Sequence, residues 1–331
     1  MKKILGIVFL ILFSTCLSVN AEVIDGRFYP IEERPIASYQ SIDNLVGHFN
    51  NKIEIIFSDI DGTILQFDKK NPKTEVPQSV KQAVLKLQKA KIPLILTTGR
   101  SYGEASEIAK SIGNDNTYII SQQGAEIIDS KGQIVYQDCF KNSDAQRILR
   151  KIEFFKKSHN MTFDVVVYAD KKPYATKETK LPYDWEKITV IKSFEDLKNA
   201  KICNICISES SPQNLKLIQK YLKNKFPNNA IVLSSDCYCE ISSKKATKGD
   251  AVKKLADILG IDLKNSATLG DAENDISMLK QVKKDGGLAI AVGNAMDMVK
   301  NNANYVTAPV TENGFAKTID KILENNALLS K

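Results

Sequence analysis

Two aspartates stand two residues apart, directly after a short apolar run, in the segment FSDIDGT (residues 57–63). Carboxylates this close repel each other when both are ionised. Either a divalent cation between Asp59 and Asp61 or a raised pKa of one of them is needed to relieve this repulsion. An Asp-x-Asp-Gly sequence also occurs in calcium loops, but the loop of an EF-hand needs a Glu at its twelfth position, and residues 66–71 do not continue that pattern. The segment is therefore a candidate for carboxylate chemistry around a cation.

A second acidic turn, GDAEND (residues 270–275), also follows a short apolar run and begins a predicted helix. Two such turns at strand ends predict an oxygen-rich magnesium site. Thr98 and Lys248 stand where helices are expected to begin, and a hydroxyl or an ammonium group there favours phosphate binding. Taken singly, Thr98 is more often a helix cap and Lys248 a surface lysine.

Alternating strand and helix patterns position these residues. Apolar runs at 53–57, 93–96 and 267–269 suit buried parallel strands, and residues 77–90 carry apolar side chains at helical spacing. A strand, helix and strand of this size predict a right-handed crossover and a parallel sheet covered by helices. Ligands bind at the carboxyl ends of such strands. We therefore expect Asp59 and the segments after the other strands to meet at one edge of the sheet.

The pattern changes in the middle of the chain. Strands there alternate apolar and polar residues, as at 163–168 and 202–207. Helical patterns at 145–158, before the first of these strands, and at 212–224, after the second, are interleaved with them. A mixed region inside an otherwise parallel fold predicts an inserted second domain, here residues 139–242.

Together these segments resemble the type IIB, Cof-like branch of the haloacid-dehalogenase superfamily over about residues 53–323. The resemblance rests on five motifs: IIFSDIDGT (55–63), LTTGR (96–100), KATKG (245–249), GDAENDISML (270–279) and AVGNA (291–295). It implies an α/β fold, with a Rossmann-like three-layer core around a parallel sheet plus an inserted α/β cap domain. The expected division is a signal peptide (1–21), an N-terminal extension (22–51), a catalytic core (52–138 and 243–331) and the cap (139–242).

The resemblance also implies a role for each matching residue. Asp59 would attack phosphorus and become an aspartyl phosphate, and Asp61 would act as general acid and then as general base. The implied ligands of Mg²⁺ are Asp59, Asp61 through its backbone carbonyl, Asp271 and Asp275. The implied phosphate-binding residues are Thr98, Gly99, Lys248 and Asn274. One departure from the family pattern is Gln123-Gly124, where an Asn-Gly is common, and it would alter contacts with the leaving group.

The expected function is a Mg²⁺-dependent phosphatase that hydrolyses small phosphorylated metabolites such as sugar phosphates. A phosphomutase of the same superfamily is the nearest alternative, and dependence on a bisphosphate activator would distinguish it. A secreted, non-catalytic binding or host-interaction protein on this scaffold is a further alternative. Loss of catalysis would be expected to change the principal motif residues first, and all four are intact: Asp59, Asp61, Lys248 and Asp271. After the first 21 residues the histidines are His48 and His159, which disfavours histidine-dependent phosphatases.

Residues 1–21 have the pattern of a secretory signal peptide: two lysines, an apolar run over 4–17 and the small-residue ending VNA. The apolar run is shorter than the ~20 residues that cross a bilayer, although an uncleaved anchor remains an alternative. We expect an exported protein, periplasmic or secreted, without stable membrane insertion once the signal is removed.

The chain of 331 residues has a formal charge of +7, with its lysines and arginines scattered rather than massed. We therefore expect a small phosphorylated substrate and no nucleic-acid partner, in a monomer or homodimer. An odd number of cysteines follows the signal: Cys139, Cys203, Cys206, Cys237 and Cys239. In a strand, residues three apart face opposite sides, so Cys203 and Cys206 do not predict a redox pair. Zinc binding is disfavoured by spacing; buried thiols, or one bridge between the strands at 202–207 and 237–239, remain open.

Overall fold

The computed structural model describes residues 21–24, 27–30, 39–66, 75–177 and 188–331. The chain divides into two units, residues 1–38 and 39–331. In the first unit, β1 (Ala21–Ile24) and β2 (Arg27–Pro30) pair as an antiparallel hairpin. The signal peptide predicted for residues 1–21 lies, apart from Ala21, outside the described residues, so it stays a prediction.

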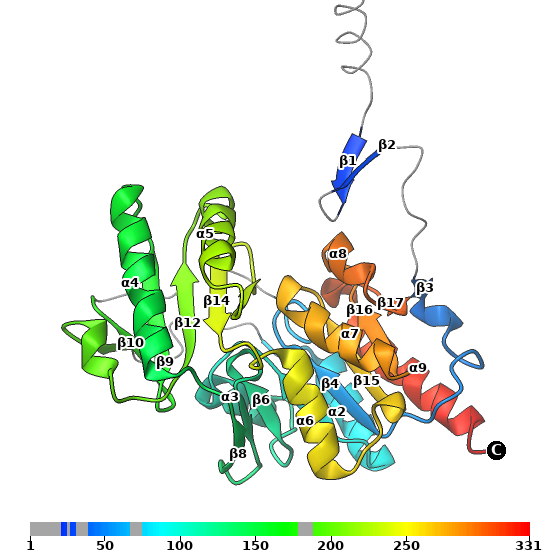
Figure 1. The fold of residues 1–331 in the computed structure, drawn as a ribbon. Helices are drawn as coiled ribbons and strands as arrows, with labels where there is room; N and C mark the ends of the chain where they lie inside the picture. Colours follow the sequence, from blue (N-terminus) through cyan, green and yellow to red (C-terminus); the bar gives the residue numbers. More distant parts are fainter. Residues whose placement is uncertain (1–20, 25–26, 31–38, 67–74, 178–187) are drawn as a thin grey trace, which may run out of the picture. The chain divides into compact units, whose positions relative to one another are not determined.

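Within the described part of residues 39–331, nine strands form the main sheet (Figure 1). From one edge to the other they are β3 (Gln40–Ser41), β17 (Tyr305–Val306), β16 (Leu288–Ala291), β15 (Ser266–Gly270), β4 (Ile55–Ser58), β5 (Leu94–Thr97), β6 (Ile119–Ser121), β7 (Glu126–Ile128) and β8 (Ile134–Gln137). Pairing is parallel from β3 through β6, while β7 and β8 pair antiparallel. The predicted parallel sheet is therefore confirmed, with an antiparallel hairpin added at one edge.

Helices cover both faces of the main sheet and make three layers. The helices of this part are α2 (Gln78–Ala90), α3 (Tyr102–Ser111), α6 (Lys248–Leu259), α7 (Ile276–Lys284), α8 (Asp297–Lys300) and α9 (Gly314–Leu328). In β4, Ile56 packs in the core formed with α2, α3 and α9, whereas Ile55 and Phe57 pack in the core formed with α6 and α7. Alternate residues of a strand face opposite sides, which explains why this strand is apolar throughout.

A second sheet of mixed pairing is formed by strands between Asp164 and Ser242. Its order is β11 (Thr189–Val190), β10 (Lys172–Ala175), β9 (Asp164–Ala169), β12 (Ile202–Ser208), β14 (Tyr238–Ser242) and β13 (Ala230–Leu233). The helices α4 (Asn142–Ser158) and α5 (Pro212–Lys225) lie on one face of this sheet (Figure 1) and share one apolar core with it. The second sheet with its two helices is the predicted α/β cap; the exact boundaries 139 and 242 stay a prediction.

The alternation of β12 and β14 gives the cap sheet a second, polar face. Ile205, Ile207 and Ile241 point into the core with α4 and α5. Cys206 lies opposite Glu240 in the pairing of β12 with β14, and both side chains belong to the other face. Because the cap helices do not cover this face, it can line a site together with residues of the main sheet.

The segment predicted as a surface extension (22–51) contributes to the core at its end. Gln40 and Ser41 form β3, which pairs parallel with β17. Ile42 and Leu45 are buried in the core cluster of the main sheet. Ile42 and Leu45 therefore belong to the core, whereas the boundary of the extension at residue 51 stays a prediction.

Three of the five cysteines are buried thiols, as one of the open alternatives had it, and the other two form a disulfide that was not predicted. A disulfide joins Cys139 to Cys203 rather than linking the strands at 202–207 and 237–239. Cys206, Cys237 and Cys239 are buried thiols. Burial raises the pKa of Cys206 and Cys239 well above the ordinary range, so neither is ionised at neutral pH.

One histidine lies at the end of a cap helix and the other at the surface. His159 caps the C-terminal end of α4 and stacks on Phe155. His48 is exposed.

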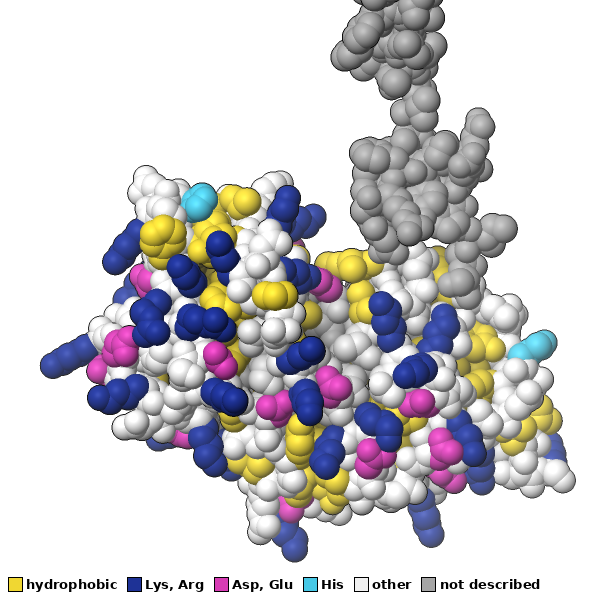
Figure 2. Space-filling model, in the orientation of Figure 1, with side chains coloured by type: hydrophobic (Ala, Val, Ile, Leu, Met, Phe, Trp, Pro, Cys, Tyr) yellow, Lys and Arg dark blue, Asp and Glu magenta, His cyan; other side chains and the backbone are white. Residues whose placement is uncertain are grey.

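On the face shown in Figure 2, lysine and arginine side chains are interspersed with aspartate and glutamate. None of the helices in the described residues is both long and apolar enough to cross a bilayer.

Candidate active site

Three neighbouring strands of the main sheet end beside one another. β4 lies between β5 and β15, and all three run parallel. Asp59 follows β4, Thr98 follows β5, and Asp271 follows β15. The Asp59 N–H donates to the carbonyl oxygen of Leu269 (3.0 Å), so the pairing of β4 with β15 continues as far as Asp59. The segments predicted to converge therefore meet at one edge of the sheet.

The turn after β4 passes close to Asp271. Gly62 has φ +78°, and a Cβ atom at this position would collide with the Asp271 carboxylate. The Thr63 hydroxyl donates to Asp271 Oδ1 (3.2 Å), and Asn294 Nδ2 donates to the Gly62 carbonyl oxygen (2.8 Å). Only glycine combines this backbone conformation with so close an approach.

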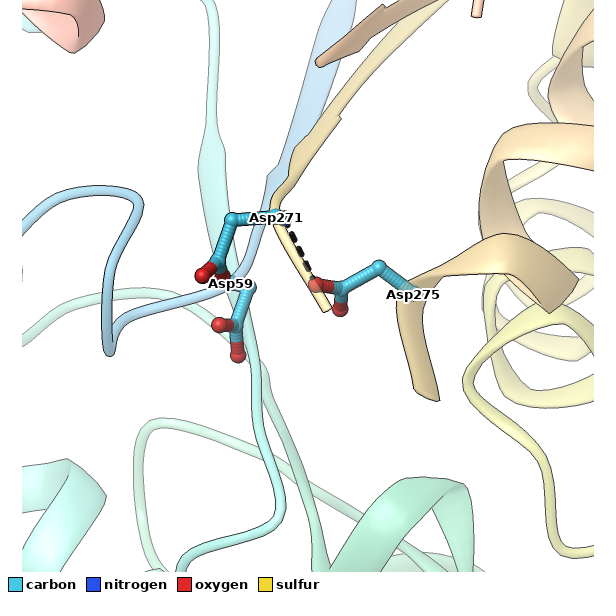
Figure 3. Close-up of side chains that lie close together, drawn as sticks. All are labelled: Asp59, Asp271 and Asp275. Carbon is cyan, nitrogen blue, oxygen red and sulfur yellow. Dashed lines mark hydrogen bonds between the residues drawn. The ribbon is translucent and has the colours of Figure 1, made fainter. Parts of the chain in front are cut away.

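Three carboxylates lie together at this edge, as Figure 3 shows for Asp59, Asp271 and Asp275. One oxygen atom from each carboxylate lies within 4.8 Å of the others. Asp275 Oδ2 accepts hydrogen bonds from the backbone N–H groups of Asp271 (2.9 Å) and Ala272 (3.0 Å). These bonds orient Asp275 toward the turn that carries Asp271, so the two acidic motifs form one cluster.

Lys248 supplies the positive charge of the cluster. It is the first residue of α6, whose N-cap is Thr247, and it is only 1% exposed. Its Nζ donates to Asp59 Oδ1 (2.6 Å) and to Asp275 Oδ1 (2.7 Å). The interpretation of Lys248 as a surface lysine is therefore wrong, because its ammonium pairs with two buried carboxylates.

Burial and mutual repulsion oppose ionisation of the acids. The pKa of Asp59 is raised to about 7, chiefly by burial, and the Lys248 ammonium limits the rise. Burial also raises the pKa of Asp271 well above its usual range, and the charge of Asp275 adds to the effect. Three carboxylates share one ammonium, so full ionisation leaves an excess of two negative charges. Hard oxygen donors with this excess charge fit a divalent cation such as Mg²⁺.

Asp61 does not join that cluster through its side chain. Its carboxylate accepts a bidentate pair of hydrogen bonds from Arg100, from Nε at 2.7 Å and from Nη2. The ligand role predicted for its backbone carbonyl stays a prediction. Arg100 had no role in the sequence-based scheme, although it stands in the TGR motif; what the motif could not reveal is the partner of its guanidinium.

The remaining predicted phosphate-binding residues line the same edge. Thr98 is buried, and its Oγ1 accepts from the backbone N–H of Arg100 (3.1 Å), which leaves the hydroxyl hydrogen to donate elsewhere. The N-cap of α3 is Ser101, so Thr98 is not the helix cap. Asn274 donates through Nδ2 to Gln123 Oε1 (3.1 Å), and its own Oδ1 is buried without a hydrogen-bond partner among the described residues.

A cavity lies over these residues, between the edge of the main sheet and the polar face of the cap sheet. The core side of the cavity includes Asp59, Asp61, Thr98, Gly99, Arg100 and Asn274. The cap side includes Tyr168, Cys206, Ser234, Ser235, Tyr238 and Glu240. No residue of the cap was predicted for the site from the sequence. The alternation of apolar and polar residues in β12 and β14 indicated that the cap sheet has a polar face. It did not indicate that this face lies over the active site.

Mg²⁺ is expected to stabilise the protein more at pH 8 than at pH 6. The pKa of Asp59 is raised to about 7, so at pH 6 the carboxyl group must lose a proton before it binds the cation, whereas at pH 8 it is already ionised. We expect the rise in unfolding temperature on adding MgCl₂ to be several degrees larger at pH 8. Differential scanning fluorimetry with and without EDTA measures it, and equal shifts at both pH values would contradict this linkage.

Comparison with known proteins agrees with this geometry. A family model described as haloacid dehalogenase-like hydrolase matches residues 56–319. Phosphatase YwpJ of Bacillus subtilis is 28% identical over 82% of this chain and 100% of its own length. A second protein of that bacterium, 5-amino-6-(5-phospho-D-ribitylamino)uracil phosphatase YcsE, is 26% identical over 81% of this chain and 94% of its own.

A solved structure shows the same fold. The subclass IIB sugar phosphatase BT4131 superposes with a TM-score of 0.68 over 82% of this chain and 99% of its own, at 21% identity. Its likeness extends over both the core and the cap. Because the family model covers most of the chain, the chain belongs to the haloacid dehalogenase-like hydrolases.

Proposed function

We propose that this protein hydrolyses small phosphate monoesters in a Mg²⁺-dependent reaction that passes through an aspartyl phosphate, the acyl phosphate of Asp59. The observation that carries the proposal is the cluster of Asp59, Asp271, Asp275 and Lys248, from which Asp59 reaches the wall of the cavity. A buried carboxylate held by an ammonium group is a suitable nucleophile for phosphorus.

In the first step, a carboxylate oxygen of Asp59 forms a bond to phosphorus while the bond from phosphorus to the leaving oxygen breaks. Asp61 gives a proton to that oxygen, so the leaving group departs as an alcohol. The Arg100 pair fixes the plane of the Asp61 carboxylate. Each oxygen of this carboxyl group has a further lone pair, which can carry the proton that passes to the leaving oxygen.

In the second step, Asp61 takes a proton from water, whose oxygen attacks phosphorus, and the bond between phosphorus and Asp59 breaks. Lys248 and the Thr98 hydroxyl donate to the phosphoryl oxygens, and the Lys248 charge favours the ionised nucleophile. Mg²⁺, held by Asp59, Asp271 and Asp275, would supply further neutralisation of the charge on the phosphoryl group.

We further propose that the leaving group is a hydroxylated metabolite such as a sugar or sugar alcohol. The cap side of the cavity is lined by four residues that carry hydroxyl groups, Tyr168, Ser234, Ser235 and Tyr238, and by the buried Glu240. Groups of this kind exchange hydrogen bonds with substrate hydroxyls. The relative YcsE is named for a substrate with a phosphorylated ribityl chain, which supports the same class.

The protein without residues 1–21 is expected to release phosphate from several sugar phosphates with Mg²⁺ and from none of them with EDTA. A panel of phosphorylated metabolites measures this by phosphate release, with and without a bisphosphate activator. Turnover that persists in EDTA after exhaustive metal removal, or an isomerised phosphate ester in place of free phosphate, would reject the proposal.

Export is proposed as the location of this activity, in the periplasm or outside the cell. The pattern of residues 1–21 supports it, and so does the Cys139–Cys203 disulfide, since such bonds persist in oxidising compartments. Cell fractionation followed by the intact mass of the purified protein tests it; a cytoplasmic protein that keeps residue 1 would contradict it.

A further inference from the structure

Glu273 has a carboxyl group that the proposed chemistry does not use. It stands between Asp271 and Asp275 in the metal-binding turn, yet its side chain contacts the cap rather than the acidic cluster. Its Oε1 accepts from Lys223 Nζ (2.8 Å), and its Oε2 accepts from Gln219 Nε2 (2.9 Å) and from the backbone N–H of Leu233 (3.0 Å). Three groups of the cap therefore converge on one core residue.

The three contacts come from two elements of the cap. Gln219 and Lys223 lie four residues apart on α5, so both face the same side of that helix. Leu233 is the last residue of β13. The Glu273 carboxylate is 17% exposed, whereas the Lys223 side chain is 46% exposed. Because an exposed ion pair contributes little, the amide and backbone donors carry most of the contact.

The contact at Leu233 bears directly on the cavity wall. Ser234 and Ser235 follow Leu233 and line the cavity, and the Ser234 hydroxyl donates to Glu240 Oε1 (3.2 Å). On the core side, Asn274 follows Glu273 and lines the same cavity. One carboxylate thus connects the turn that carries two of the acids with the cap segment that faces the leaving group.

We propose that Glu273 is a positioning residue that holds the β13 end of the cap against the metal-binding turn and so places the wall of Ser234 and Ser235 over the leaving group. The inference rests on the proposed function. It predicts a dependence on leaving-group size, because a substrate that reaches the cap needs this wall, whereas one that occupies only the phosphate site does not.

The test compares Glu273→Met with two control variants. Methionine keeps the length of the side chain but removes both carboxylate oxygens, so the Gln219 and Leu233 donors lose their shared acceptor as well as Lys223 its own. Lys223→Met removes only the exposed ion pair. Glu195→Gln removes an exposed acid that pairs with Arg150 inside the cap, and it controls for the change of charge.

For Glu273→Met we expect kcat/KM for the best sugar phosphate of the panel to fall at least ~10-fold, mainly through KM, while acetyl phosphate, whose leaving group is small, changes less than ~2-fold. Amide hydrogen exchange at Leu233 should become at least ~10-fold faster, and the Mg²⁺ concentration for half activation should stay within ~2-fold. Both controls should resemble the wild type in every measurement.

Equal losses on both substrates, or a higher Mg²⁺ requirement with unchanged exchange at Leu233, would overturn the proposal, because Glu273 would then act only within the metal-binding turn. The exchange measurement needs no substrate. If the wild-type protein hydrolyses nothing, the proposed function fails, while exchange at Leu233 still tests whether Glu273 holds the cap.

Discussion

Asp59→Asn is expected to lower kcat for the best substrate at least ~10³-fold, as the removal of a covalent nucleophile does. The amide nitrogen and the neutral carbonyl oxygen of asparagine are poor nucleophiles for phosphorus. The side chain is buried and fills the same volume after the substitution, so the loss is expected without unfolding. Phosphate release under saturating Mg²⁺ measures the effect.

A label on the protein separates loss of the nucleophile from loss of binding. Wild-type protein quenched in acid during turnover of a ³²P-labelled substrate should retain label, and Asp59→Asn should retain none. Asp320→Asn makes the same chemical change on the exposed side of α9 and should behave as the wild type. Turnover by Asp59→Asn close to that of the wild type would reject Asp59 as the phosphate acceptor.

Lys248→Met is expected to destabilise the metal-free protein by about 3–5 kcal/mol at pH 8, the range for breaking a buried ion pair from one side. Methionine fills the channel of the lysine side chain but leaves Asp59 and Asp275 without their shared donor. Urea unfolding in EDTA measures the loss. Activity should also fall at least ~10²-fold, since the group that neutralises the phosphoryl oxygens is gone.

The loss should depend on pH in a defined direction. Without Lys248, the buried acids take up protons more readily, and protonation relieves their repulsion. Asp59 already has a raised pKa of about 7 with Lys248 present, so the variant should lose less stability at pH 5.5 than at pH 8. Lys253→Met on the same helix, where the lysine is exposed, should change stability by less than about 0.5 kcal/mol. A loss for Lys248→Met no larger than for this control would contradict the ion-pair network.

The sequence by itself determined the core of the fold and the residues at its edge. Short apolar runs before Asp59 and Asp271 are a local signal, and the carboxyl ends of adjacent parallel strands meet for reasons of topology. Helix boundaries were likewise close, as in α2, where apolar side chains repeat at helical spacing. The five motifs therefore indicated both the architecture and the family without any knowledge of distances.

The partners of these residues were decided only by the tertiary structure. The pattern of a strand shows which side chains share a face, but not which element lies opposite that face. Three contacts of this kind join segments that are far apart in the sequence. They are the ion pairs of Lys248 with two carboxylates, the ion pair of Arg100 with Asp61, and the Cys139–Cys203 disulfide. Such pairs depend on the order of strands and on the docking of the cap, which are set by packing of the whole molecule.

Glu273 illustrates the same limit most clearly. In the sequence it is one of three acids within five residues, and nothing local separates it from Asp271 and Asp275. In the structure the two aspartates turn toward the cation site and Glu273 turns toward the cap. The direction of each side chain follows from the short helical turn at 273–275 and from the strand packed against it, and a sequence pattern records neither.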